Sequence, residues 1–395
     1  MRGLVTRGFS MTVGASMAVG MIFMMQAPLL HQPSTFESAL AGLNVPAATP
    51  IAWPSVGSAA LFIPVLGVQR SYHNEVLPIA SLTKMMTAYV TLEKLPLSVG
   101  EIGPCLNVNA ADVTYYDTIT AQGQSSAAVA VGERLCENQL LSGLLVHSAG
   151  NFATMLANLA WGGTQAFVAH MNADAQQLGL GGTHYVDVTG IGTGSVSTAL
   201  EQGELAAALM KYAVVRAIVD QPTVTLPVAG TLNSYTPFVG QDNVVGVKSG
   251  RTDAAGGCDV MAMTFTYQGQ SELAFVVVLG ARGGNLLGPA GNEALALASS
   301  VVTSQQSLEI PAGTVVGTIG WDNERVNVVT QLHVRLDYFT ALTGANTQVS
   351  VFPQSGPIAA GKVVGWLTVN DGSNIRVPLT VVHRLAPLTL FQRVA

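Results

Sequence analysis

The sequence predicts an α+β domain over residues 56–304, followed by a small all-β domain over residues 305–395. In the first range, segments with the hydrophobic spacing of helices are mixed with segments typical of strands, whereas the second contains only short β-type runs. The length of 395 residues exceeds one ordinary domain and fits two. Because 49% of the residues are hydrophobic, the chain can fill a large core.

The first thirty residues form a separate segment. Arg2 and Arg7 precede an uncharged apolar run at residues 8–30, which is the pattern of an export signal. A helix of this length, at about 1.5 Å per residue, could also span a bilayer, so residues 1–30 are either a signal peptide or a retained membrane anchor. A buried helix of a cytosolic protein is the remaining alternative. Because the arginines precede the run, we expect the rest of the chain to be exported.

Local patterns place the elements that follow. Residues 31–55 are rich in proline, alanine and serine and are expected to be a linker, and residues 305–311 are expected to link the two domains. A helical pattern over 138–161 is interrupted near Ser148, which predicts two helices. The other expected helices are 81–95, 165–180, 198–215 and 293–304, and the expected strands are 58–67, 246–250, 256–269 and 271–282, of which the last two form a hairpin around Gln268–Gln270.

Several classes of function are disfavoured by composition and spacing. The net charge of −6 and the lack of a basic cluster argue against nucleic-acid binding. The 7 histidines are scattered without an H-E-x-x-H motif, so we expect no metal site, and we expect no cofactor. The glycine-rich residues 190–195 do not lie between a strand and a helix, and are predicted to be a surface turn rather than a dinucleotide loop.

The 3 cysteines are Cys105, Cys136 and Cys258. Export would permit a disulfide, and Cys105 with Cys136 is one candidate pair. The alternative is that all three are small buried hydrophobic residues.

Ser81 and Lys84 are the first pair of residues that could carry chemistry. They lie three apart at the start of an expected helix, where their side chains share one face. A serine becomes a nucleophile when a base takes its proton, and apolar surroundings lower the pKa of a lysine. This pair alone is weak evidence, because a solvated lysine at a helix start is more common.

Two further segments strengthen this hypothesis. Residues 144–153 place Ser148 at a helix break, followed by small residues and the amide of Asn151. Residues 244–258 place Lys248 and Ser249 on a strand that then reaches a glycine. The lysine and hydroxyl could hold a carboxylate, and the glycine would let a substrate backbone approach closely.

The motifs S-L-T-K, S-A-G-N and K-S-G, in this order, resemble those of the serine-type D-alanyl-D-alanine carboxypeptidases, the low-molecular-mass penicillin-binding proteins. The stretches IASLTKMMTAYVTLE, LLSGLLVHSAGN, LGLGGTHYVDVTGI and GVKSGRTDAAGGC carry the resemblance, which extends over about residues 56–300. It implies a β-lactamase/DD-peptidase-like fold, in which an antiparallel sheet carries helices on both faces beside a helical subdomain. It also implies a role in the bacterial cell envelope.

The resemblance implies a role for each motif residue. Ser81 would attack the carbonyl between two D-alanines of a peptidoglycan stem peptide, with Lys84 as its general base and Ser148 passing a proton to the leaving amine. Lys248 would supply positive charge. The remaining implied substrate-binding residues are Ser249 for the terminal carboxylate, Gly250 for close approach, Arg251 and Ser81 for the oxyanion through their N–H groups, and Thr252. β-Lactams would acylate the same serine.

The sequence departs from the family pattern in its second motif. Where the family has asparagine, this chain has Gly150, and the amide follows at Asn151. Either the loop shifts so that Asn151 serves as a substrate-binding residue, or the amide is lost. The third motif has serine where threonine is more usual, which preserves the hydroxyl.

Two alternative functions remain open. A serine β-lactamase of class A would need a glutamate in an E-x-x-L-N setting after the second motif, and residues 148–248 contain none. A catalytically impaired envelope protein of the same fold is the other alternative, supported by the displaced amide.

Overall fold

The computed structural model describes residues 33–39, 48–321, 324–342, 346–370 and 375–386. The expected signal or anchor at residues 1–30 lies outside these ranges. The chain divides into two units, one of Pro50–Ser304 and one that combines the residues up to Thr49 with those from Gln305 onward. Among the described residues, no helix is both long enough and apolar enough to cross a membrane.

The first unit is built on a five-stranded antiparallel sheet with the order β10-β11-β12-β2-β3. The turn between its two longest strands has positive φ angles at Gln268 and Gly269, and the hairpin predicted there is confirmed. The strands are β2 (Ser58–Ile63), β3 (Val68–Tyr72), β10 (Val244–Thr252), β11 (Gly256–Tyr267) and β12 (Gln270–Ala281).

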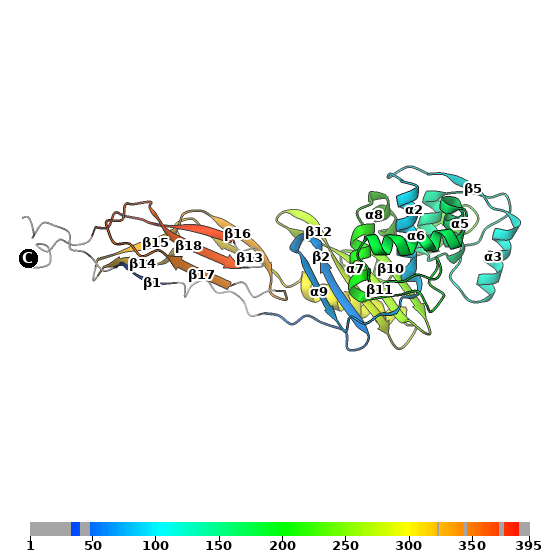
Figure 1. Cartoon of the computed structure of the whole chain (residues 1–395), viewed down its shortest axis with the longest axis horizontal. Helices are drawn as coiled ribbons and strands as arrows, with labels where there is room; N and C mark the ends of the chain where they lie inside the picture. The colour runs from blue at the N-terminus through cyan, green and yellow to red at the C-terminus, as the bar shows by residue number, and fades with distance from the viewer. Residues whose placement is uncertain (1–32, 40–47, 322–323, 343–345, 371–374, 387–395) are drawn as a thin grey trace, which may run out of the picture. The chain divides into compact units, whose positions relative to one another are not determined.

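Helices cover both faces of this sheet (Figure 1). A Cβ atom at Gly257 of β11 would lie 3.2 Å from Ala290 of α9, which places α9 on one face. On the other face, Gly203 of α7 lies against Val277 of β12. The helices of this unit are α2 (Thr83–Lys94), α3 (Ala110–Ala121), α4 (Glu137–Val146), α5 (Gly150–Trp161), α6 (Thr164–Gln177), α7 (Ala199–Leu209), α8 (Ala213–Val219) and α9 (Leu287–Val302).

The expected fold class is therefore confirmed, with differences in detail. The helix expected over 198–215 is two helices, α7 and α8, because the chain turns at 210–212. The two helices expected around Ser148 are α4 and α5. Short two-stranded pairs complete the unit, namely β4 (Leu77–Pro78) with β7 (Val196–Ser197), β5 (Cys105–Asn107) with β6 (Arg134–Cys136), and β8 (Thr223–Leu226) with β9 (Gly230–Asn233).

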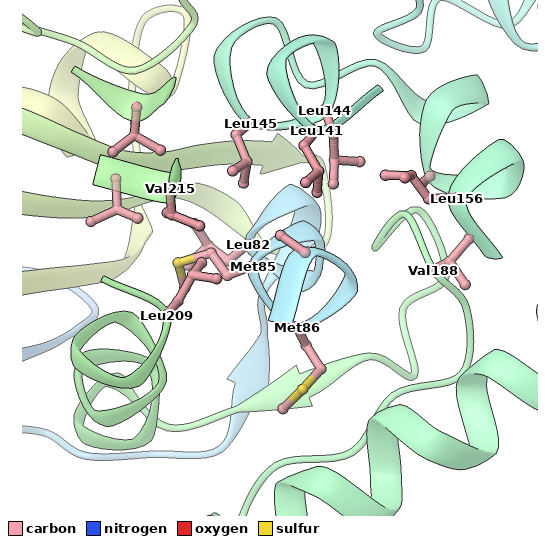
Figure 2. Close-up of a cluster of buried hydrophobic side chains, with 14 of the residues drawn as sticks. Leu82, Met85, Met86, Leu141, Leu144, Leu145, Leu156, Val188, Leu209 and Val215 are labelled. Carbon is pink, nitrogen blue, oxygen red and sulfur yellow. The ribbon is translucent and has the colours of Figure 1, made fainter. Parts of the chain in front are cut away.

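Helix α2 lies in the centre of the main hydrophobic core (Figure 2). Most of its apolar side chains are buried, and the helix packs against α4, α5, α6 and α7. Burying one such side chain stabilises the fold by about 1.5–3 kcal/mol, so α2 is held firmly along its length. The cluster in the figure includes Leu82, Met85, Met86, Leu141, Leu144, Leu145, Leu156, Val188, Leu209 and Val215.

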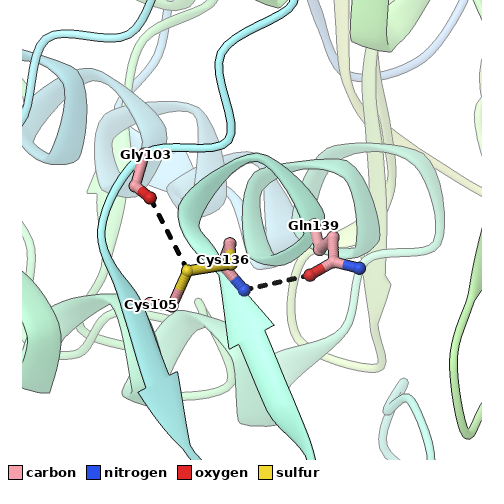
Figure 3. Close-up of a disulfide and its surroundings, with 4 residues drawn as sticks. All are labelled: Gly103, Cys105, Cys136 and Gln139. Carbon is pink, nitrogen blue, oxygen red and sulfur yellow. Dashed lines mark hydrogen bonds between the residues drawn. A yellow bond between two sulfur atoms is a disulfide. The ribbon is translucent and has the colours of Figure 1, made fainter.

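A disulfide joins Cys105 of β5 to Cys136 of β6, as the sequence suggested (Figure 3). The two strands are paired at these residues, directly before α4. Cys258 is free and buried. The disulfide closes a loop that contains α3 and the residues after it, which form one wall of the cleft described below.

The second unit is an all-β structure. A six-stranded sheet has the order β1-β14-β15-β19-β18-β17, and β13 pairs with β16. Its buried face is made of aliphatic side chains such as Val328, Leu367 and Leu379. The strands are β1 (Thr35–Ser38), β13 (Gln305–Ile310), β14 (Val315–Trp321), β15 (Glu324–Thr330), β16 (Val334–Phe339), β17 (Asn346–Val351), β18 (Val363–Asn370) and β19 (Ile375–Val381).

Two segments expected to be linkers contain strands. Within the expected linker 31–55, Thr35–Ser38 forms β1 and pairs with β14 in the second unit. Within the expected linker 305–311, Gln305–Ile310 forms β13 and pairs with β16. In both cases the partner strand is separated in sequence, β14 for β1 and β16 for β13, and local composition does not reveal such a partner.

Candidate active site

Ser81 and Lys84 meet at the start of α2. Ser81 lies in a single 3-10 turn, Ala80–Leu82, which runs directly into the helix. The lysine Nζ donates a hydrogen bond of 2.9 Å to Ser81 Oγ and a second of 2.8 Å to the carbonyl oxygen of Thr189. The sequence spacing of three thus becomes a direct contact between a hydroxyl and an amine.

The position of Lys84 favours its uncharged form. The side chain is buried, and removal of the ammonium from water lowers its pKa to about 7, although the carboxylate of Asp187 opposes this shift. A large fraction of the amine is therefore unprotonated near neutral pH. An unprotonated amine 2.9 Å from a hydroxyl can accept its proton.

The loop that receives Lys84 was not recognised from the sequence as part of the site. Asp187 accepts hydrogen bonds from the backbone N–H groups of Thr189, Gly190 and Gly192, which fixes the carbonyl of Thr189 in place. A Cβ atom at Gly190 would lie 1.8 Å from the carbonyl oxygen of Ala80, so this loop packs directly on the turn that carries Ser81. The surface turn expected at 190–195 is confirmed at 192–194, and the residues before that turn, Gly190 and Ile191, also line the cleft.

Ser148 lies between α4 and α5 in the left-handed backbone region, with φ of 62°. Its side chain is buried, and within the described residues its Oγ has no hydrogen-bond partner. Ser148 and Ser81 line the same small cavity. A hydroxyl held there without a protein partner is available to a substrate, since a buried polar group gains by making a hydrogen bond.

Asn151 does not face this cleft, so the expectation that it binds substrate is wrong. Its side chain is buried, and its Oδ1 accepts a hydrogen bond of 3.1 Å from the N–H of Ala127. Its Nδ2 donates a hydrogen bond of 2.8 Å to the carbonyl oxygen of Ala127. Gly150 lines the cleft instead. The amide of the second motif is therefore lost from its usual position and holds a neighbouring segment.

Strand β10 forms the opposite wall. Its Ser249 and Gly250 line the smaller cavity beside Ser81. A Cβ atom at Gly250 would lie 2.6 Å from the backbone nitrogen of Ser81, so only glycine allows the strand to come this close. Ser249 Oγ donates a 2.8 Å hydrogen bond to the carbonyl of Tyr235.

Lys248 lies beneath this wall and is completely buried. Its Nζ donates a 2.6 Å hydrogen bond to the carbonyl of Ser249. Burial and the nearby Lys84 lower its pKa, while Asp259 acts in the opposite direction. Two amines so close disfavour each other's charge, and here it is the deeply buried Lys248 whose pKa is lowered by Lys84.

Asp259 is a second feature that the sequence did not reveal. It lies on β11 opposite Ser249, is buried, and within the described residues neither carboxyl oxygen has a hydrogen-bond partner. Burial raises its pKa to about 8, although the nearby Lys248 favours the ionised form. The strand expected at 256–269 placed this residue in a core without a signal that its carboxyl would adjoin the site.

These walls enclose two adjoining cavities of about 340 and 180 Å³. Arg251 lines both, and the exposed Asp253 lines the larger one with Thr252. Across the parts of the chain that the structure describes, no three His, Cys, Asp or Glu side chains gather as a metal site would require. The residues that line both cavities are Ser81, Gly123, Gln124, Ser125 and Arg251.

Comparisons with known proteins agree with this geometry. Residues 68–283 match a family model described as D-alanyl-D-alanine carboxypeptidase. The chain is 31% identical to a D-alanyl-D-alanine endopeptidase of Escherichia coli K12, over 54% of this chain and 70% of that protein. It is 30% identical to a D-alanyl-D-alanine carboxypeptidase of Streptomyces strain K15, over 47% of this chain and 67% of that protein.

Solved structures share the fold. Penicillin binding protein 5 of Haemophilus influenzae is similar with a TM-score of 0.57 at 19% identity, over 87% of this chain and 99% of that one. The DD-transpeptidase of Streptomyces K15 is similar with a TM-score of 0.55 at 24% identity, over 62% of this chain and 97% of that one.

Proposed function

The chain belongs to the D-alanyl-D-alanine carboxypeptidase family, and we propose that it removes the terminal D-alanine of peptidoglycan stem peptides through an acyl-enzyme on Ser81. The observation that carries this proposal is the 2.9 Å contact between Ser81 Oγ and the buried amine of Lys84. A nucleophile and a base in this contact are what acyl transfer requires.

In the first step Lys84 takes the proton of Ser81, and the serine oxygen forms a bond to the carbonyl carbon between the two D-alanines. The backbone N–H groups of Ser81 and Arg251 stabilise the negative oxygen that results; removing one such donor typically costs about 10²–10³ in rate. The carbon–nitrogen bond then breaks, and the departing amine of D-alanine takes a proton through the Ser148 hydroxyl. Water afterwards hydrolyses the ester and frees Ser81.

The terminal carboxylate of the substrate binds at the β10 wall. Ser249 offers a hydroxyl there, and Lys248 beneath it supplies positive charge when protonated. Gly250 gives the substrate backbone room beside Ser81, and Thr252 with Arg251 lines the way in. A β-lactam carries a carboxylate and a reactive amide in a similar arrangement, and it acylates the same serine.

Mass spectrometry of the intact protein after penicillin treatment tests this function. We expect a single covalent adduct on Ser81 that lasts many minutes, and release of D-alanine from a stem peptide. The variant Ser81→Ala should lose both, with an unchanged melting temperature, because the side chain is small and only half-buried. Rapid turnover of the adduct would instead identify a β-lactamase, and a lack of both reactions in the unaltered protein would identify a non-catalytic envelope protein.

We also propose that the chain acts outside the cytoplasmic membrane. The arginines and the apolar run of residues 1–30 support export, as does the disulfide between Cys105 and Cys136, since disulfides persist in oxidising compartments. Fractionation of the producing cell, with the mass of the mature protein, would separate a cleaved signal from a retained anchor. Recovery of the full-length protein from the cytosol would contradict export.

A further inference from the structure

The second motif leaves one task of a D,D-peptidase without an assigned residue. The third position of the second motif is Gly150, which has no side chain. The side-chain amide of Asn151 is hydrogen-bonded to the backbone of Ala127. Under the proposed function, a peptide bound with its scissile bond at Ser81 would place its next backbone amide, on the acyl side, in this part of the cleft. A buried peptide group that finds no hydrogen-bond partner weakens binding.

The segment 122–125 occupies the space beside Gly150. The N–H of Gly150 donates a 2.8 Å hydrogen bond to the carbonyl of Ser125. A Cβ atom at position 150 would lie 3.2 Å from that same carbonyl oxygen and 3.5 Å from Cδ1 of Ile119. The loss of a side chain at 150 is therefore matched by the close approach of this segment, which follows α3.

Gln124 is the amide that this segment brings to the cleft. It is half-buried and lines both cavities, as does Ser81. Within the described residues, its one side-chain hydrogen bond is 2.7 Å long and runs from its Nε2 to Oε1 of Gln122 on the rim. Its own Oε1 and its second N–H therefore stay available for a ligand in the cavity.

We propose that Gln124 binds the amide on the acyl side of the substrate, in place of the side chain that the second motif lacks. This inference rests on the proposed function, since it concerns the same site. A side-chain amide can both donate to a peptide carbonyl and accept from a peptide N–H, so it suits a peptide backbone. Gln124 is thus a substrate-positioning residue and takes no part in proton transfer.

Two β-lactams that differ in one amide test the assignment. Benzylpenicillin carries an acylamino side chain, which stands in for the substrate amide, whereas 6-aminopenicillanic acid carries a free amine there. The second-order rate constant for acylation of Ser81 is measured for both compounds by quenching the reaction at a series of times and determining the acylated fraction by mass spectrometry of the intact protein. The proteins compared are the unaltered chain, Gln124→Ala, and the control Gln177→Ala, which changes an exposed glutamine at the end of α6.

We expect Gln124→Ala to react about tenfold more slowly with benzylpenicillin, the loss of roughly one hydrogen bond, and within about twofold of the unaltered rate with 6-aminopenicillanic acid. Gln177→Ala should change neither rate. An equal loss with both compounds would show that Gln124 only supports the cleft wall, and unaltered rate constants with both compounds would show that it does not bind the amide; either result overturns the inference. If the unaltered protein reacts with neither compound, the proposed function itself is wrong.

Discussion

The two units of the molecule differ in whether they bury ionisable side chains. In the part of the chain that the structure describes, the buried Lys, Arg, Asp and Glu side chains are Lys84, Glu137, Lys248 and Asp259, and all lie between Pro50 and Ser304. The polar side chains buried in the β unit are hydroxyls, such as Thr330 and Thr380. Burying an ionisable group costs several kcal/mol, so the first unit gives up stability that the second retains.

Three of the four buried ionisable groups surround the cleft, and the fourth does not. Lys84 lowers the pKa of Lys248, and Lys248 and Asp259 each act on the other's pKa, across the start of α2 and the strands β10 and β11. Glu137 lies at the start of α4 beside Gly103, outside the residues that line either cavity. Three of the buried ionisable groups therefore lie at the proposed active site, whereas Glu137 is buried at a position for which no role is proposed.

The largest effect should come from the base. Lys84→Ala removes the proposed proton acceptor of Ser81, and we expect the rate constant for acylation by penicillin to fall by about 10²–10⁴-fold. Loss of a buried amine should at the same time leave the melting temperature unchanged or raised, because the cost of its burial disappears. Acylation at a near-normal rate, followed by mass spectrometry, would mean that another residue is the base.

In the β unit a comparable change should affect stability alone. Leu367 is fully buried on β18, and Leu367→Ala should reduce the free energy of unfolding of this unit by about 2–5 kcal/mol. The acylation rate of the folded protein should stay the same, since the described residues that line the two cavities all lie between Pro50 and Ser304. Denaturant titration followed by circular dichroism measures the first quantity. A loss of acylation rate before unfolding would break the contrast between the units.

Glu137→Gln should stabilise the first unit at neutral and higher pH. Burial raises the pKa of Glu137 from 4.5 to about 7, so the folded chain holds a proton that the unfolded chain has released. Stability is therefore lost as the pH rises from 4.5 to about 7 and stays constant above it. The variant should remove this loss and gain about 1–3 kcal/mol at about pH 8.

Denaturant titrations of the unaltered protein and of Glu137→Gln at several pH values would measure that gain. The two proteins should have equal stability near pH 4, where both side chains are neutral in the folded and unfolded states. If the variant gained the same free energy of unfolding at every pH, the cause would be a change in packing at position 137 and not the ionisation of Glu137.

The smallest expected effect is the pH dependence of acylation. The pKa of Lys84 is lowered to about 7, and only the neutral amine can accept the proton of Ser81. The acylation rate constant should therefore rise about tenfold between about pH 6 and about pH 8 and then level off. Stopped-flow measurements with a chromogenic β-lactam would record the profile, and Glu137→Gln should reproduce it. A flat profile would show that Lys84 is not the titrating group.

Sequence patterns predicted the parts of the fold that depend on neighbouring residues. The apolar spacing over 81–95 indicated α2, and Gln268 with Gly269 marked the hairpin between β11 and β12. The three motifs also indicated the family. Each of these signals lies within a short stretch, where periodicity and turn-forming residues act directly.

What the patterns missed depends on contacts between distant segments. Thr35–Ser38 becomes a strand only because Gly317–Gly320 lies beside it. In the sequence, Asp259 is one polar residue within an apolar strand. Only the strand register in the structure shows that it lies opposite Ser249. Gln124 looks like an ordinary loop residue, and only the fold brings it to the cleft. The Asp-x-Thr-Gly stretch at 187–190 was the one local sign of a tight, side-chain-braced turn.

The disulfide between Cys105 and Cys136 makes the stability of the cleft wall depend on the redox conditions around the protein. It ties off a span of 31 residues that includes α3 and Gln124, and such a closure restrains the unfolded chain by roughly 3–4 kcal/mol. Thiol reductants in an assay, or production in a glutathione-rich host, would leave that span fastened only by its packing. The capture of peptide amides would then weaken before the chemistry at Ser81 did, so activity measured under such conditions would understate the selectivity of the oxidised protein.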